Sequence, residues 1–384
     1  MKTTFNIQQM PFTKFGYQVI KNLQDDIRMI GAERALLIID RDMKNIGLTT
    51  SIETCVSSTF HHFHIHVIEE KILSFSSIQK ALESLGDQKF DIIIGYGGWR
   101  CIDMSKVLSI ALTNDFSKEM VKSGTHRIAN HGIPIVSIPT TPPNGAEIDD
   151  NVIIRDQTTK HIHVFRHDFM IPRLTIIDPY LMLTMPLDLT ASTGLDSLSH
   201  GIEALISMNA SPFSEMYALQ GLALLKENLL VAFRFPDNIT ARYNVALGSL
   251  YTALALNMTG SGVVHAMSYP LSARYDISHP QASAMMLPYI MKFNLPIVRP
   301  QMARIARYFG KAVQDEETDA EKAIDAILEL FHQLEHPTDL RAYNVPRIEF
   351  DLLVESVLGY ESFLQRNPRI IQNEDIKTIY EDAL

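Results

Sequence analysis

Hydrophobic and polar positions follow two different patterns along the chain, and the change between them divides it into two parts. In the first part, short apolar runs typical of strands alternate with stretches of helical character. The strands are expected at residues 35–39, 60–68, 91–94 and 133–138, with helices over residues 77–85 and 103–112. Nearly continuous apolar strands joined by helices predict a parallel sheet that is covered on both faces.

In the second part, apolar residues recur at helical spacing and no strand is indicated. The expected helices cover residues 190–208, 215–233, 238–257, 281–293, 297–309, 320–332 and 349–364. Prolines punctuate residues 178–186, where we expect the linker. The prediction is a Rossmann-like α/β domain over residues 1–182, followed by an all-helical domain over residues 183–384.

Composition restricts the class of protein. A chain of 384 residues with 46% apolar and 20% charged residues is typical of a globular protein of two domains. Its formal net charge of −10 argues against binding to nucleic acid, and no apolar run is long enough to span a membrane. With two cysteines and no apolar leader at the start, we expect a cytoplasmic protein without disulfides.

Glycines follow the third expected strand. Residues 95–98 read Gly-Tyr-Gly-Gly and lead into a helix, a pattern that lets a backbone approach a phosphate closely. Arg100 could pair with that phosphate, and Asp40, at the end of the first expected strand, could accept hydrogen bonds from a ribose diol. The alternatives are that the glycines only end a strand and that Asp40 only caps a helix.

Asp196 and His200 lie four residues apart in an expected helix, so they share one face. With His265 and His279 further along, they would make a set of one carboxylate and three imidazoles that suits iron, zinc or nickel. The alternative is a surface pair, because nothing in the spacing links His200 to the later histidines. His62, His64 and His66 alternate along a strand and form a competing cluster, which we interpret as a solvated or half-buried face.

Longer segments resemble the iron-containing (group III) alcohol dehydrogenase family, and the resemblance covers nearly the whole chain. It is carried by residues 95–106, 138–147, 189–204 and 367–369. The resemblance implies a dehydroquinate synthase-like fold, with NAD and metal bound in the cleft between the two domains. It also implies a divalent metal, iron first and zinc or nickel as alternatives, on Asp196, His200, His265 and His279.

The resemblance implies further site residues and an activity. The cofactor-binding positions would be Asp40, Gly97, Gly98, Arg100, Asp103, Thr140, Thr141, Asn151, Lys160 and Leu181. Such an enzyme interconverts a primary alcohol and an aldehyde, here with a polar or sugar-acid substrate as one option, and works as a homo-oligomer, typically a dimer. Its expected partner is a small-molecule alcohol or aldehyde, and we expect it to bind neither nucleic acid nor a membrane.

Several residues depart from the pattern of the family, among them residues 142–146 and 280–284. Three further departures concern the candidate sites directly. Trp99 and Arg100 replace a glycine and a serine of the loop, and Tyr269 stands where most members carry a second, non-ligand histidine that relays protons. We assign the proton-handling role to Tyr269, although a phenol of pKa near 10 relays protons less readily at neutral pH. The alternative hypothesis is a degenerate member that binds nucleotide or metal without turnover.

Overall fold

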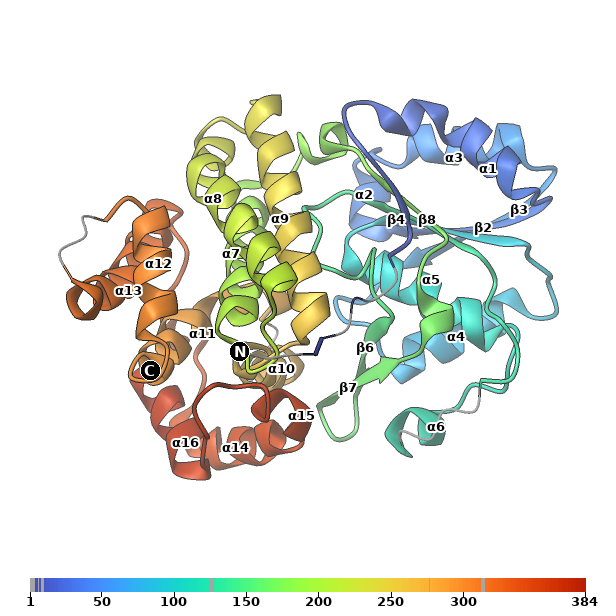
Figure 1. The fold of residues 1–384 in the computed structure, drawn as a ribbon. Helices are drawn as coiled ribbons and strands as arrows, with labels where there is room; N and C mark the ends of the chain where they lie inside the picture. Colours follow the sequence, from blue (N-terminus) through green and yellow to red (C-terminus); the bar gives the residue numbers. More distant parts are fainter. Residues whose placement is uncertain (1–3, 6, 8–9, 124–127, 276, 312–314) are drawn as a thin grey trace. The chain divides into compact units, whose positions relative to one another are not determined.

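The fold is that of a computed structural model, and it describes residues 4–5, 7, 10–123, 128–275, 277–311 and 315–384. The chain forms two compact units (Figure 1). Gln9–Met182 make an α/β unit, and Leu183–Leu384 make a helical unit to which the first residues of the chain belong. Phe5 lies against Phe213 of the helical unit, with ring centroids 5.5 Å apart.

The α/β unit is built on a six-stranded parallel sheet in the order β1-β8-β5-β4-β2-β3 (Figure 1). The strands are β1 (Phe12–Phe15), β2 (Arg34–Asp40), β3 (His62–Ile68), β4 (Ile92–Gly97), β5 (Ile135–Pro139) and β8 (Leu174–Ile177). The predicted parallel sheet is confirmed, and its four predicted strands correspond to β2, β3, β4 and β5. The residue pattern does not predict β1 and β8, because strands of four residues are too short to show one.

Helices cover both faces of the sheet. They are α1 (Leu23–Ile30), α2 (Arg41–Asn45), α3 (Thr50–Thr59), α4 (Phe75–Leu85), α5 (Trp99–Ala111) and α6 (Lys118–Ser123). Along β2, Leu37 and Ile39 pack with α1 and α3, whereas Leu36 and Ile38 face the core that contains α4 and α5. The chain runs outward from β2 to β3 and, on the other side, from β4 to β5. The carboxyl ends of β2 and β4 therefore form the switch point where α/β sheets bind ligands.

A separate antiparallel hairpin of β6 (Asn151–Asp156) and β7 (His161–Arg166) packs on the same core as α5. A buried ionic cluster joins the two. Lys106 of α5 pairs with Asp149 and donates to the carbonyl of Asn151 at 3.0 Å, and Asp103 accepts the Ile153 N–H at 3.1 Å. The hairpin is a second element that the apolar pattern does not predict, because each of its faces mixes polar and apolar residues.

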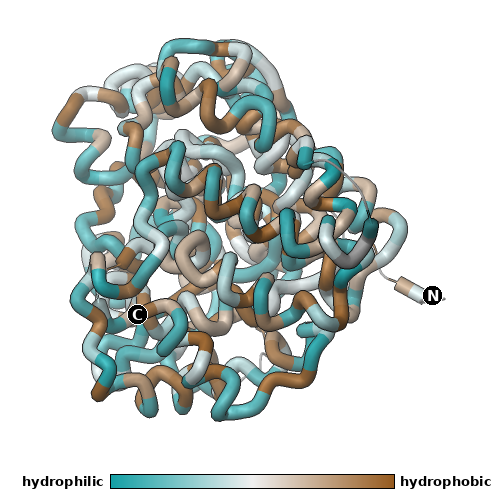
Figure 2. The backbone as a smooth tube through the Cα atoms, turned by 90° about the vertical axis from the view of Figure 1, so that its left-hand side faces the viewer, coloured by the Kyte–Doolittle hydropathy of each residue, from teal (hydrophilic) through white to brown (hydrophobic). Residues whose placement is uncertain are grey.

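The helical unit contains no strand among its described residues, as predicted. Its helices are α7 (Leu187–Ile206), α8 (Pro212–Arg234), α9 (Ile239–Thr259), α10 (Val263–Tyr275), α11 (His279–Asn294), α12 (Arg299–Tyr308), α13 (Glu316–Gln333), α14 (Phe350–Leu358), α15 (Glu361–Leu364) and α16 (Asn373–Asp382). Hydrophobic and hydrophilic residues are interspersed along the backbone on the face of the molecule that Figure 2 shows. Within the described residues, no helix has both the length and the apolar character needed to cross a membrane.

One sequence prediction about the helical unit needs correction. The helix expected over residues 349–364 is divided into α14 and α15 at Gly359 and Tyr360. The C-terminal signature, residues 367–369, holds the fold together: Asn367 and Asn294 exchange amide hydrogen bonds of 2.8 Å. Arg369 stacks on the ring of Phe293 and donates to its carbonyl at 2.8 Å.

Replacing Glu147 by Gln should change how the free energy of unfolding depends on pH. Glu147 precedes the hairpin and is buried, and burial raises its pKa from 4.5 to about 7. The protonated carboxyl therefore stabilises the folded chain fully below pH 4.5, and this contribution is lost as the pH rises through 7. The loss is about 1.4 kcal/mol per pKa unit, or about 3 kcal/mol in all. Urea unfolding of both proteins from pH 4.5 to about pH 8 measures it.

The stability of the wild type relative to E147Q should fall across this range. The exposed variant E33Q controls for the loss of one negative charge. A constant difference between the wild type and E147Q would contradict a raised pKa for Glu147.

Candidate functional site

Helix α7 carries acidic and imidazole side chains on one buried face. Asp196, His200 and Glu203 are spaced four and then three residues apart, so they share a stripe. Every residue from Thr190 to Ile206 is buried, and these three side chains are at most 5% exposed. Ionisable groups in such a position need a compensating partner, because desolvation of a charge is costly.

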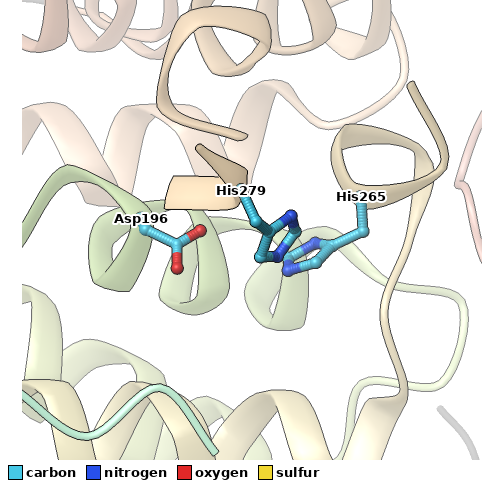
Figure 3. Close-up of side chains that lie close together, drawn as sticks. All are labelled: Asp196, His265 and His279. Carbon is cyan, nitrogen blue, oxygen red and sulfur yellow. The ribbon is translucent and has the colours of Figure 1, made fainter. Parts of the chain in front are cut away.

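Two histidines from other helices meet this stripe. His265 lies in the first turn of α10 and His279 begins α11. The ligand atoms of Asp196, His265 and His279 all lie within 4.8 Å of one another. In Figure 3, the two imidazoles lie next to each other and the carboxylate of Asp196 is directed toward them. Among the described residues, this is the only such group of three or more histidine, cysteine or acidic side chains.

The fourth predicted ligand, His200, lies beside the group of three. Its Nε2 is 3.5 Å from Oδ2 of Asp196, and its ring stacks on that of His265 at 5.1 Å between centroids. The structure thus brings all four predicted ligands into one neighbourhood, although His200 is outside the tightest group. The competing residues His62, His64 and His66 lie on the edge strand β3 and join no group of this kind in the described part of the chain.

The donor set fits a divalent transition metal. Burial lowers the pKa of His200 and of His279 to about 3, so both imidazoles are neutral at physiological pH, which is the form that binds metals. Among the described residues, Nδ1 of His200 and Oδ1 of Asp196 are buried without a hydrogen-bond partner. One carboxylate and several imidazoles suit iron, zinc, nickel and similar ions better than magnesium or calcium.

Glu203 is a site residue that the sequence analysis missed. Its carboxylate accepts a hydrogen bond of 2.5 Å from Nδ1 of His265 and another of 2.7 Å from the Val264 N–H. Burial acts to lower the pKa of His265, but the negative charge of Glu203 and this hydrogen bond outweigh burial and raise it. The bond holds the proton on Nδ1 and leaves Nε2 of His265 available for a metal.

Tyr269 lies against the histidines and belongs to an aromatic cluster. Its ring centroid is 5.2 Å from that of His279, and the rings of Tyr360 and Phe363 lie at 5.3 and 5.9 Å. The side chain is buried, 3% exposed, on the same helix as His265. A phenol therefore stands next to the candidate metal ligands, as the resemblance implied.

In the α/β unit, the glycine loop lies where β4 ends. Gly97 has a φ of +151°, and a Cβ there would lie 2.5 Å from Sγ of Cys101, so only glycine fits. Gly98 is the N-cap residue of α5, and a Cβ at Gly98 would meet nothing closer than Thr141 at 3.9 Å. The Thr140 N–H donates to the carbonyl of Gly97 at 3.0 Å. Gly97, Gly98, Thr140 and Thr141 are thus together at the switch point of the sheet.

Asp40 and Arg100 form an ion pair beside this loop. Nη2 of Arg100 donates to Oδ2 of Asp40 at 2.5 Å, and the Cβ that Gly97 lacks would be 3.9 Å from Cβ of Asp40. Asp40 also caps α2, because its Oδ1 accepts the Asp42 N–H at 2.9 Å. Asp40 therefore both caps α2, as the alternative interpretation proposed, and pairs with Arg100. Helix α5 starts at Trp99 rather than near residue 103, which places Arg100 in its first turn.

The remaining predicted cofactor residues are dispersed. The carboxyl group of Asp103 is part of the buried cluster with Lys106, and Asn151 begins β6 with its amide on Asp149 at 2.5 Å. Leu181 packs against the core on the α1 side of the sheet. Lys160 is exposed in the turn at the opposite end of the hairpin from Asn151, so the structure does not bring these two residues together.

Replacing Glu203 by Gln should weaken the binding of a divalent metal. The variant keeps the shape of the side chain but removes the charge that orients His265, and loss of such a partner typically lowers metal affinity about tenfold to a hundredfold. Competition for Zn²⁺ against a coloured chelator measures the dissociation constant. The exposed α8 variant E227Q is the matched control, and wild-type affinity in E203Q would show that Glu203 does not support the ligand.

Comparisons with known proteins identify the family of the chain. A profile described as the Fe-containing alcohol dehydrogenase family, C-terminal, matches residues 190–384, and one described as iron-containing alcohol dehydrogenase matches residues 11–179. The chain is 30% identical over 378 residues to the 1,3-propanediol dehydrogenase of Klebsiella pneumoniae, covering 96% of each chain. It is 28% identical over 379 residues to long-chain-alcohol dehydrogenase 1 of Geobacillus thermodenitrificans, covering 97% of this chain and 95% of that one.

The fold is also that of a solved relative. The crystal structure of a 1,3-propanediol oxidoreductase superposes with a TM-score of 0.92 at 28% identity, covering 99% of this chain and 100% of that one. The predicted dehydroquinate synthase-like fold is therefore confirmed. The chain belongs to the iron-containing alcohol dehydrogenase family, as an NAD(H)-dependent oxidoreductase that interconverts alcohols and aldehydes.

Proposed function

We propose that Asp196, His200, His265 and His279 bind one divalent metal, iron first and zinc or nickel as alternatives, for the oxidation of a primary alcohol. The observation that carries the proposal is the convergence of a buried carboxylate with imidazoles from three helices. When bound, the cation would stabilise negative charge on the substrate oxygen. In the α/β unit, Asp40, Gly97, Gly98, Thr140 and Thr141 would hold the nucleotide.

The chain's own residues have three tasks in this reaction. The histidines and Asp196 supply ligand atoms at fixed positions, and Glu203 keeps His265 in one tautomer. Tyr269, in its ionised phenolate form, would accept the hydroxyl proton at its phenol oxygen and become a neutral phenol, because its ring is adjacent to those of His265 and His279. When bound, NAD⁺ would supply the hydride acceptor, so that loss of the hydroxyl proton and of a hydride from carbon would give an aldehyde and NADH.

The substrate that we propose is a small primary alcohol with a further polar group, a diol being the simplest example. Two observations support it. Relatives from Klebsiella pneumoniae and Citrobacter freundii are named 1,3-propanediol dehydrogenases, and two phenols follow the ligands, Tyr269 beside His279 and Tyr360 beside Tyr269. A sugar acid is the second option. The alternative of a degenerate member without turnover receives no support from the comparisons, since the relatives carry the names of dehydrogenases.

Location and assembly are part of the same proposal. We propose a cytoplasmic enzyme, consistent with free Cys55 and Cys101, that acts as a homo-oligomer, most simply a dimer. Its partners would be small molecules, with neither nucleic acid nor membrane involved.

Replacing His265 by Ala should abolish both metal retention and turnover. The variant removes a ligand and leaves the charge of Glu203 buried without its imidazole partner. Metal analysis of the purified protein, together with NADH absorbance on a panel of alcohols and aldehydes after loading with ferrous iron, measures the two losses. H62A, on the exposed start of β3, is the control. Unchanged metal content in H265A would contradict the ligand assignment, and an inactive iron-loaded wild type would favour the degenerate alternative.

Replacing Tyr269 by Phe should lower turnover without loss of metal. The ring is retained, so the aromatic cluster stays packed, but the hydroxyl that handles the proton is lost. General acid–base groups typically contribute about a hundredfold or more to rate. Steady-state kcat at several pH values should fall by that factor and lose its pH dependence on the alkaline side, while bound metal stays at the wild-type level. Wild-type kcat in Y269F would remove Tyr269 from the mechanism.

A further inference from the structure

We infer that Arg100 widens the nucleotide specificity of this enzyme, so that NADP(H) binds in addition to NAD(H). The inference rests on the proposed nucleotide site at the carboxyl ends of β2 and β4. In sites of this kind, an acidic residue accepts hydrogen bonds from the ribose diol of NAD, whereas an arginine accommodates the 2′-phosphate of NADP. This chain has both residues, and the structure shows them in contact.

The carboxylate of Asp40 is engaged on both of its oxygens. Oδ1 accepts the Asp42 N–H at 2.9 Å, and Oδ2 accepts Nη2 of Arg100 at 2.5 Å. The side chain of Asp40 is only 8% exposed, so its charge faces a guanidinium and not water. An acidic residue excludes a 2′-phosphate by repulsion, and this repulsion is largely cancelled when the carboxylate is paired at hydrogen-bond distance.

Arg100 itself is placed to receive a phosphate. It extends from the first turn of α5, and its Nη1 donates to the carbonyl of Glu70 at 3.0 Å, which fixes the plane of the guanidinium. The side chain is 23% exposed and therefore still reaches solvent. A guanidinium has five N–H donors in a rigid fork, and the bonds to Asp40 and Glu70 leave donors for phosphate oxygens.

The other acidic side chains of this segment add little repulsion. Glu69 pairs with Arg41, and Glu70 lies 3.6 Å from the ammonium of Lys80. Asp42 is exposed, so solvent and salt screen its charge. Arg100 therefore decides the sign of the local potential at Asp40, and we identify it as the specificity-determining residue.

The experiment compares the dissociation constants of NAD⁺ and NADP⁺ in the wild type, R100S and D40N. Trp99 is the chain's only tryptophan and precedes Arg100, so its fluorescence is a direct probe, with calorimetry as the second measurement. The wild type should bind both nucleotides. R100S should weaken NADP⁺ about tenfold to a hundredfold, the effect of a hydrogen bond to a charged group, with little change for NAD⁺. D40N should shift the ratio toward NADP⁺.

The matched control is R34S, because Arg34 pairs with Asp91 at 2.6 Å at the opposite, amino-terminal end of β2. It should leave the ratio of the two constants unchanged. Retained NAD⁺ binding in R100S shows that the variant is folded. If the ratio of the NADP⁺ and NAD⁺ dissociation constants is the same in R100S as in the wild type, the inference is overturned while the proposed function stands. If the wild type binds neither nucleotide, the proposed nucleotide site is wrong and the inference fails with it.

Discussion

Burial of a carboxylate and imidazoles on a fully enclosed helix is the constraint on which the helical unit depends. Asp196, His200 and Glu203 lie on a face of α7 that water does not reach. Such groups destabilise a fold unless each one is paired or bound to a cation. Glu203 is satisfied by His265 and by backbone N–H groups, whereas Asp196 and His200 keep buried atoms without partners among the described residues. These are the buried atoms that the proposed divalent metal would satisfy.

A comparable buried cluster supports the α/β unit, but there the positive charge belongs to the chain. Lys106 is fully buried and pairs with Asp149, while Asp103 holds the hairpin through Ile153. Since Lys106 and Asp103 are both on α5, the helix that follows the glycine loop is fixed to the β6–β7 hairpin. The loop motif extends well into the helix, and its two parts have different tasks. Its later residues position α5, and its earlier ones leave room for a phosphate.

The parts of the fold that the sequence predicts are those with a long periodic signal. The strand that becomes β2 and the helix that becomes α7 are predicted almost to their ends, because burial on defined faces imposes a pattern. Helix α10 is not predicted as a helix, since it contains Pro270 and is buried on nearly all sides, which removes any amphipathic period. Short strands such as β1 carry too few residues for a pattern.

The site was predictable only in part for the same physical reason. The spacing of Asp196 and His200 shows that they share a face, but no spacing connects them to His265 and His279, which enter from other helices. The resemblance to a family supplied that connection. The sequence analysis missed Glu203 because glutamates on helices are usually solvated. The only sequence signal for a role in the site was its position, seven residues after Asp196 on a helix without a polar face.

Two residues at the glycine loop, Trp99 and Arg100, depart from the family pattern. They change the side chains around the proposed phosphate position, but they leave the backbone free to approach a phosphate. Gly97 and Gly98, at which the backbone is left open, are retained, and Gly97 needs its positive φ. Trp99 and Arg100 start α5, so their side chains leave from the helix and not from the turn. Arg100 then meets Asp40, the carboxylate that we propose for ribose recognition. A substitution of this kind alters which nucleotide is preferred and leaves intact the loop that binds one.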